Sequence, residues 1–280
     1  MAWTARIQRL RARAEERLPV LSELTSRLLS ANLLDAGTRL AAQAFLAAVP
    51  LLFAVAAFTP HGVREQLRES LQAMFGLSGQ ANTELQQVLG GSADDTVRET
   101  SGAVGVVVAL VSATSFSRVM ARVCERAWRL PRASTRIAVW RWFAWLLVLM
   151  LFVLFQGPIR SGFGVGLWLG IPVLFVVSTG VWLWTQRLLL AGRVGWLPLL
   201  PGAILTAAST TALALTARLY VPNALNRALE EYGSFGLVLT VLSWLIVVCA
   251  AATFSVTIGA VLAEEPPLNR LLTRDRATGE

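Results

Sequence analysis

The chain has 280 residues and a formal net charge of +8, and it is 55% hydrophobic but only 15% charged. Soluble domains carry about 25% charged residues, and here the apolar residues gather in long runs, which excludes an ordinary water-soluble domain. All 25 basic residues are arginine. No nucleic-acid-binding signature accompanies this positive charge, so we expect no nucleic acid partner.

Six apolar stretches predict an all-α protein with six transmembrane helices. A helix that spans a bilayer needs about 20 mostly apolar residues. The candidates are residues 40–58, 102–117, 138–157, 163–185, 196–217 and 235–262. The second stretch is short and rich in small residues, which suits a helix that faces other helices rather than lipid. The transmembrane domain is therefore expected to cover 40–262.

The distribution of arginine predicts the orientation in the membrane. Of the 25 arginines, 19 lie in four segments, namely 1–39, 118–141, 186–195 and 263–280. The other six lie in the alternate segments 59–101, 158–162 and 218–234. Arginine favours cytoplasmic loops, so both the N-terminal segment and the C-terminal tail are predicted to be cytoplasmic. Tryptophans flank the same ends of the spans, at positions 140, 142, 145, 182, 184 and 196, where indoles anchor a helix at the interface.

The outer loop 59–101 is the longest predicted connection between spans. An apolar stripe indicates a short amphipathic helix; its members are Val63, Leu67, Leu71, Met74 and Phe75. A second short helix is expected to follow it, and Asp94 and Asp95 suit the start of the helix that enters the second span. The loop is either a passive cover or a lid for a molecule that enters from the outer leaflet.

Small residues and prolines mark places where helices can bend or approach closely. Stripes of small residues four apart occur in the last three spans and include Gly202 in the fifth and Gly259 in the sixth. Pro50, Pro172 and Pro201 lie within predicted spans and are candidate kinks. Close packing explains most of these residues, and a seam that slides during transport is the alternative.

Few polar side chains interrupt the predicted spans. The intramembrane candidates are Arg39, Gln43, Gln156 and Arg160. Asp35 precedes Arg39 by four residues, a spacing that predicts an ion pair at the interface. Because no acidic residue lies deep in a span, the sequence disfavours a proton pump of the usual carboxylate type.

The cytoplasmic stretch 117–136 contains a row of arginines on one helical face. Arg118, Arg122 and Arg126 are spaced four apart, and Arg129 adjoins them. Guanidinium groups bind phosphate oxygens in a bidentate way, so this row is a candidate site for anionic lipid head groups. The alternative is that the row reflects only the preference of arginine for the cytoplasmic side.

Residues that carry enzyme chemistry are scarce. We find no nucleophile elbow, Gly-rich phosphate loop or metal-ligand set, and His61 is the sole histidine, so we expect neither an enzyme nor a cofactor. Cys124 lies in a basic setting that predicts a lowered pKa. Cys249 lies in an apolar run, and we expect the two cysteines in different layers without a disulfide.

Four sequence elements together extend over most of the chain. They are RLAAQAFLAAVPLLF in the first span, FSRVMARVCERAWRLPRAS with its Arg126 and Trp128, Pro201-Gly202-Ala203 in the fifth span, and Tyr232-Gly233 with Gly236 and Trp244 at the start of the sixth. In these elements residues 30–265 resemble the YihY/BrkB family of bacterial inner-membrane proteins. One difference is that the family commonly ends its last helix with Gly-Ala-Glu, whereas here Val261 follows Gly259 and Ala260.

The resemblance implies a multi-pass protein of a bacterial plasma membrane. Members of the family were once labelled a ribonuclease, which is regarded as mistaken, and others have been linked to serum resistance and lipid transport. Our leading hypothesis is therefore a protein that binds or translocates a lipid or another amphiphile, with membrane lipids, including anionic ones, as its partners. A scaffold for envelope assembly is the alternative, and a membrane-bound nuclease the third. The sequence leaves a homo-oligomer open.

Overall fold

The computed structural model describes residues 33–58, 95–131 and 167–264, with shorter pieces at 62, 65–69, 72, 83, 141, 144–145, 147–152 and 155. These residues form helices joined by turns, with no strand among them, which confirms the predicted all-α class. Both predicted cytoplasmic termini fall mainly outside the described residues. So do Gln156, Arg160 and most of the outer loop.

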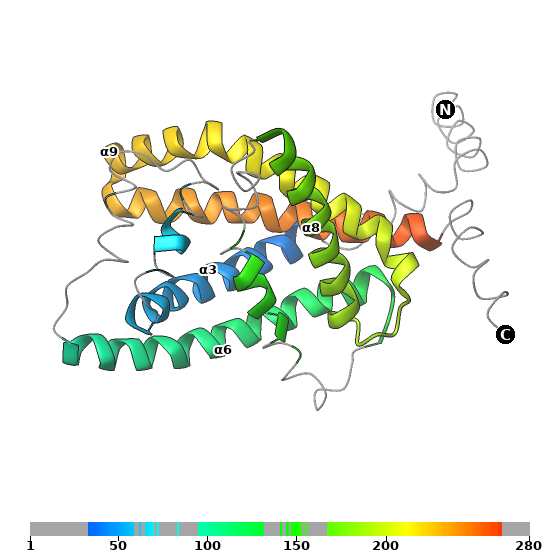
Figure 1. The fold of residues 1–280 in the computed structure, drawn as a ribbon, viewed down its shortest axis with the longest axis horizontal. Coiled ribbons are helices and arrows are strands. Elements are labelled where there is room, and N and C mark those ends of the chain that lie inside the picture. Colours follow the sequence, from blue (N-terminus) through cyan, green and yellow to red (C-terminus); the bar gives the residue numbers. More distant parts are fainter. Residues whose placement is uncertain are drawn as a thin grey trace, which may run out of the picture.

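Four labelled helices make up most of the described structure: α3 (Leu33–Phe58), α6 (Asp95–Ala127), α8 (Leu167–Leu189) and α9 (Trp196–Glu264). A kink at Gly233 divides α9 into two helices that fold back on each other as a hairpin (Figure 1). The helices α3 and α6 run in opposite directions beside this hairpin, and α8 crosses the group near one end (Figure 1). These helices contain the first, second, fifth and sixth predicted spans and most of the fourth.

The first half of α9 is longer than the sequence predicts. We expected an outer connection at 218–234, but the helix continues to Gly233. Hydropathy falls after residue 217, yet an apolar stripe continues and packs against the second half of α9. Its buried members are Ala217, Val221 and Leu225. The end of the predicted fifth span at residue 217 is therefore not the end of a helix, because charged residues lower the hydropathy of a helix without ending it.

Gly233 has φ 60° and ψ −149°, a region of backbone conformation that only glycine occupies readily. No heavy atom lies within 4 Å of the place where a Cβ would be added. We therefore expect Gly233→Ala to lower the stability of the hairpin by about 1–3 kcal/mol through backbone strain alone. Thermal unfolding of the purified protein in detergent measures this change, and an unchanged melting temperature would contradict it.

The main hydrophobic core lies where all these helices meet, at the end of the bundle that holds the connection between α8 and α9. Its buried side chains include Leu40 from α3, Met120 from α6, Leu190 after α8, and Val256 from α9. Trp145, from the predicted third span, is 1% exposed, and its indole N–H donates to Thr185 Oγ1 at 3.1 Å. Interior packing of this kind fixes the helix ends that carry the site described below.

Glycines permit three close approaches between helix backbones. A Cβ on Gly259 would lie 2.1 Å from the Cα of Gly202, and one on Gly37 would lie 2.8 Å from the Cα of Ala250. A Cβ on Gly236 would lie 2.2 Å from the carbonyl oxygen of Ala228. The small-residue stripes of the fifth and sixth predicted spans thus face each other across the α9 hairpin. Such contacts let helices associate where lipid provides no hydrophobic driving force.

Both halves of α9 expose much of their apolar surface. Trp196–Gly233 and Phe235–Glu264 are long and apolar enough to cross a membrane, with mean hydropathy of 1.5 and 2.5 in their most apolar windows. In the 18-residue segments that have these values, only 28% and 17%, respectively, is buried within the protein. A core helix of a soluble protein would be mostly buried, so the outward faces of α9 require another apolar partner.

The outer loop contributes a short described piece at 65–69, which is helical. Leu67 is buried, whereas Glu65 and Glu69 are exposed, as an amphipathic helix requires. Arg68 forms an ion pair with Glu65. The helix α6 begins at Asp95, where the sequence places acidic residues suited to a helix N-terminus.

Candidate functional site

The candidate site lies where α6 and α8 end, and both helices end in the same way. After α6, Arg129 has φ 49°, the Leu130 N–H donates to the Glu125 carbonyl at 2.9 Å, and the Arg129 N–H donates to the Arg126 carbonyl at 3.1 Å. After α8, Ala191 has φ 61° and the Gly192 N–H donates to the Arg187 carbonyl at 3.0 Å. These are Schellman caps with a non-glycine residue in the left-handed position, and they turn both chains sharply.

Arg193 joins the two helix ends. Its Nη2 lies 2.7 Å from Glu125 Oε1, its Nη1 donates to the Pro131 carbonyl at 2.5 Å, and its Nε donates to the Leu190 carbonyl at 3.0 Å. Glu125 is buried, so a charged partner is needed to hold it there. We call the region formed by 118–131, Arg141 and 187–196 the basic end.

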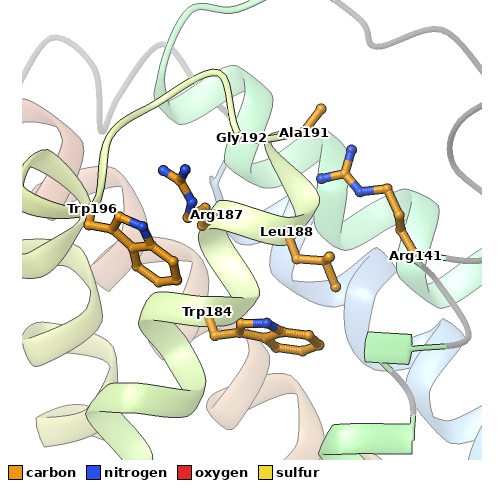
Figure 2. Close-up of a pocket in the computed structure, with 7 residues that line it drawn as sticks. All are labelled: Arg141, Trp184, Arg187, Leu188, Ala191, Gly192 and Trp196. Atoms are coloured by element: carbon orange, nitrogen blue, oxygen red, sulfur yellow. The ribbon is translucent and has the colours of Figure 1, made fainter.

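A cavity of about 280 Å³ opens at the basic end. Its lining residues are Arg141, Trp184, Arg187, Leu188, Ala191, Gly192 and Trp196. Figure 2 shows the side chains of Arg187 and Trp196 together on one side and that of Arg141 on the other, with Trp184 and Leu188 from α8 between them. The cavity therefore combines cationic groups with indole and aliphatic walls.

Two contacts fix the guanidinium of Arg187. Its Nη1 donates to the Val194 carbonyl at 3.0 Å, and its Cζ lies 4.6 Å from the centre of the Trp196 ring. A cation over an indole is attracted by the ring quadrupole, which restricts the orientation of the planar group. Among the described residues no carboxylate pairs with Arg141 or Arg187. Glu125, the buried carboxylate of the basic end, is bound to Arg193 instead. The cavity therefore carries positive charge that the described part of the chain leaves unneutralised.

The arginine row predicted from the sequence lies on the exposed side of α6, outside the cavity lining. Arg118, Arg122 and Arg126 are exposed, and the Nε of Arg122 donates to the Arg118 carbonyl at 3.2 Å. Arg129 occupies the helix cap rather than the helical face. Arg118, Arg122 and Arg126 thus form a row that faces solvent or lipid, whereas the backbone of Arg129 forms the cap of α6.

The other predicted residues are spread over the bundle. Arg39 pairs with Asp35, with Nη2 and Oδ2 3.1 Å apart, and both are exposed, while Gln43 is half-buried. The three predicted prolines lie inside helices, Pro50 in α3, Pro172 in α8 and Pro201 in α9. Gly202 and Gly259 form the close contact within the α9 hairpin.

The prediction of a lowered pKa for Cys124 was wrong. Burial, and to a smaller extent the charge of Glu125, raises the pKa of Cys124 to about 12. The cause is that Cys124 is fully buried in the main core, although the surrounding sequence is basic. Both Cys124 and Cys249 are free, as predicted, although both belong to that core.

This raised pKa predicts a pH dependence of stability. The folded state holds the Cys124 proton more tightly than the unfolded state, whose thiol has a pKa near 9.0. The resulting stabilisation is present below pH 9 and is lost as pH rises toward the folded pKa of about 12. We expect the melting temperature to fall from about pH 9 upward, and less so in Cys124→Ala. Parallel pH curves for the two proteins would contradict this account.

A comparison of the sequence with models of known protein families shows which family the chain belongs to. A family model described as Virulence factor BrkB matches residues 24–277, which is most of the chain. The chain belongs to the BrkB family. No curated protein and no solved structure matches it. BrkB family membership and the two long apolar helices indicate an integral protein of a bacterial membrane.

In this BrkB family protein, sequence reasoning missed the cavity and a buried amide. Gln186 is 1% exposed, and neither Oε1 nor Nε2 has a hydrogen-bond partner among the described residues. The signal for the cavity was present in the interleaved Trp184, Arg187 and Trp196, which we interpreted only as interface anchors and topology markers. Thr185 and Gln186 together end an apolar run, and that polar break was the available signal for the buried amide.

Proposed function

We propose that this BrkB family protein is a six-span protein of the bacterial inner membrane that binds, and moves across that membrane, a lipid or another amphiphile. The observation that carries the proposal is the combination of exposed apolar helix faces with a basic end. A lipid has the same two parts, because its tails need apolar surface and an anionic head group needs cations.

The orientation follows from the arginine distribution. The basic end holds Arg118, Arg122, Arg126, Arg129, Arg141, Arg187 and Arg193. The ion pair between Arg193 and Glu125 brings two predicted cytoplasmic segments together, which supports their lying on one side of the membrane. By the positive-inside rule this side is the cytoplasm, with both termini there and the Gly233 turn outside.

In the proposed mechanism, the arginine row, the exposed faces of α9 and the glycine contact within α9 have different roles. Arg118, Arg122 and Arg126 attract an anionic head group to the cytoplasmic interface, where the surface potential of the leaflet adds to their effect. The tails remain in the bilayer against the exposed faces of α9, which carry Leu197, Leu200, Ile204, Val238, Leu239, Val241 and Val247. The Gly202–Gly259 seam lies inside the bundle and keeps the two halves of α9 in register.

Reconstitution in liposomes tests this proposal. Purified protein should speed the transfer of a labelled anionic lipid between leaflets, and neutralising Arg118, Arg122 and Arg126 together to glutamine should slow the transfer severalfold at equal protein incorporation. Arg227→Gln is the matched control, because Arg227 is an exposed arginine on α9 near the Gly233 turn. Equal transfer rates in empty and protein-containing vesicles would rule out translocation.

A non-transporting scaffold is the second candidate. The helical extension before Gly233 exposes Leu219 (79%), Tyr220 (62%) and Tyr232 (65%), and Phe235 follows the turn with 65% exposure. An apolar and aromatic surface beyond the expected membrane boundary suits docking to another envelope protein. Crosslinking from Tyr220 and Tyr232 in cells, combined with absent lipid transfer in vitro, would favour this candidate.

A further inference from the structure

We propose that the cavity at the end of α8 is a binding site for the phosphate group of a lipid, held between Arg141 and Arg187. The inference deepens the proposed function by naming the recognised group and by assigning its binding to the cavity rather than to the exposed row on α6. Binding of phosphate at this site does not require that the protein translocate lipid.

The charge balance of the site calls for an anion. Two guanidinium groups, those of Arg141 and Arg187, line the cavity, and Arg193 directly follows its lining residue Gly192. The one carboxylate described near them, Glu125, is bound to Arg193. Like charges gathered in a partly buried site repel each other, and a bound anion relieves that repulsion.

The donors that face the cavity are suited to phosphate. Arg187 uses Nη1 for the Val194 carbonyl, which leaves its other N–H groups without a partner among the described residues. The contact with the Trp196 ring fixes the plane of the Arg187 guanidinium group, with its fork of N–H donors, even without a ligand. Arg141 forms no hydrogen bond within the described residues and reaches the cavity from a separate element. Two planar forks can together satisfy several oxygens of one tetrahedral group.

The walls and the size of the cavity favour a lipid over free phosphate. Trp184, Leu188 and Trp196 supply indole and aliphatic surface next to the guanidinium groups. Indoles prefer the membrane interface, where a glycerol backbone and the first methylenes of the acyl chains lie. A volume of about 280 Å³ is at the lower limit for small-molecule pockets, so it suits a head group and not a whole lipid.

Calorimetric titration of the full-length protein in a non-ionic detergent tests the inference. The ligands are monomeric dihexanoyl phosphatidylglycerol, dihexanoyl glycerol with the same chains but no phosphate, and inorganic phosphate. We expect the phospholipid to bind more tightly than inorganic phosphate and dihexanoyl glycerol to bind weakest. Equal affinity for the phospholipid and dihexanoyl glycerol would overturn the phosphate site. Tighter binding of inorganic phosphate than of the phospholipid would overturn the lipid as its source.

Variants locate the site within the protein. Arg141→Gln and Arg187→Gln should each weaken phospholipid binding about ten- to a hundredfold, because each removes charge-assisted hydrogen bonds. Arg187→Lys should weaken it too, since an ammonium group keeps the charge but not the fork. Arg227→Gln should bind as the parent protein does. Because Arg141 has no hydrogen bond to the described fold, unchanged binding in a folded Arg141→Gln variant would overturn the assignment even if Arg187→Gln fails to fold.

Discussion

Replacement of Gly259 by alanine is expected to destabilise the protein by about 3 kcal/mol or more, the upper part of the range for overpacked interiors. The added Cβ would lie 2.1 Å from the Cα and 2.4 Å from the backbone nitrogen of Gly202. Neither atom belongs to a flexible side chain, so the two halves of α9 must move apart. Thermal unfolding in detergent, followed by tryptophan fluorescence, measures the effect.

Gly180→Ala provides the matched control for this experiment. Gly180 also lies within a helix, α8, but no heavy atom lies within 4 Å of the place where its Cβ would be added. Alanine favours helix by about 1 kcal/mol relative to glycine, so this variant should be as stable as the parent or more stable. The account of the glycine seam would be wrong if Gly259→Ala and Gly180→Ala unfolded at the same temperature.

Replacement of Gln186 by leucine is expected to stabilise the protein by about 1–3 kcal/mol. Both polar atoms of this buried side chain lack partners among the described residues, and an unsatisfied buried amide carries a desolvation cost that an apolar side chain of similar size avoids. Gln186→Glu should do the opposite, because it places a charge in the same site. Melting temperatures of the three proteins give the comparison.

The Gln186→Leu variant also separates the effect of this residue on stability from its effect on function. If the amide of Gln186 contacts a polar group of the substrate during transfer, Gln186→Leu will raise the melting temperature and lower the rate of lipid transfer in liposomes. If the amide has no such role, the rate will be unchanged while the stability still rises. A lower stability of Gln186→Leu would contradict the structural account itself.

Much of the fold was predictable because hydrophobic run length determines where membrane helices occur. The first, second and sixth spans lie within α3, α6 and the second half of α9, and most of the fourth lies within α8. The helix that contains the fifth predicted span continues beyond it to Gly233, because hydropathy marks an apolar stretch and not the end of a helix. The amphipathic stripe of Val221 and Leu225 would have revealed the extension.

Less of the site could be predicted, because the cavity depends on how two chains turn. The caps after α6 and α8 place Arg129 and Ala191 in the left-handed region, where sequence statistics favour glycine. Neither Arg129 nor Ala191 is a residue type from which a left-handed cap is predicted. The pairing of Arg193 with Glu125 is likewise non-local, because the partners are 68 positions apart in the sequence. The error at Cys124 has the same origin, since its basic neighbours in sequence are directed away from its buried thiol.

Labelling of single introduced cysteines tests most directly the claim that the basic end faces the cytoplasm. Glu231 and Arg126 are exposed residues near opposite ends of the bundle, and the two native cysteines are buried. A membrane-impermeant maleimide applied to cells with a permeabilised outer membrane should label Glu231→Cys. It should label Arg126→Cys only after the inner membrane is opened. The reverse pattern, with Arg126→Cys labelled in closed cells and Glu231→Cys protected, would contradict the account.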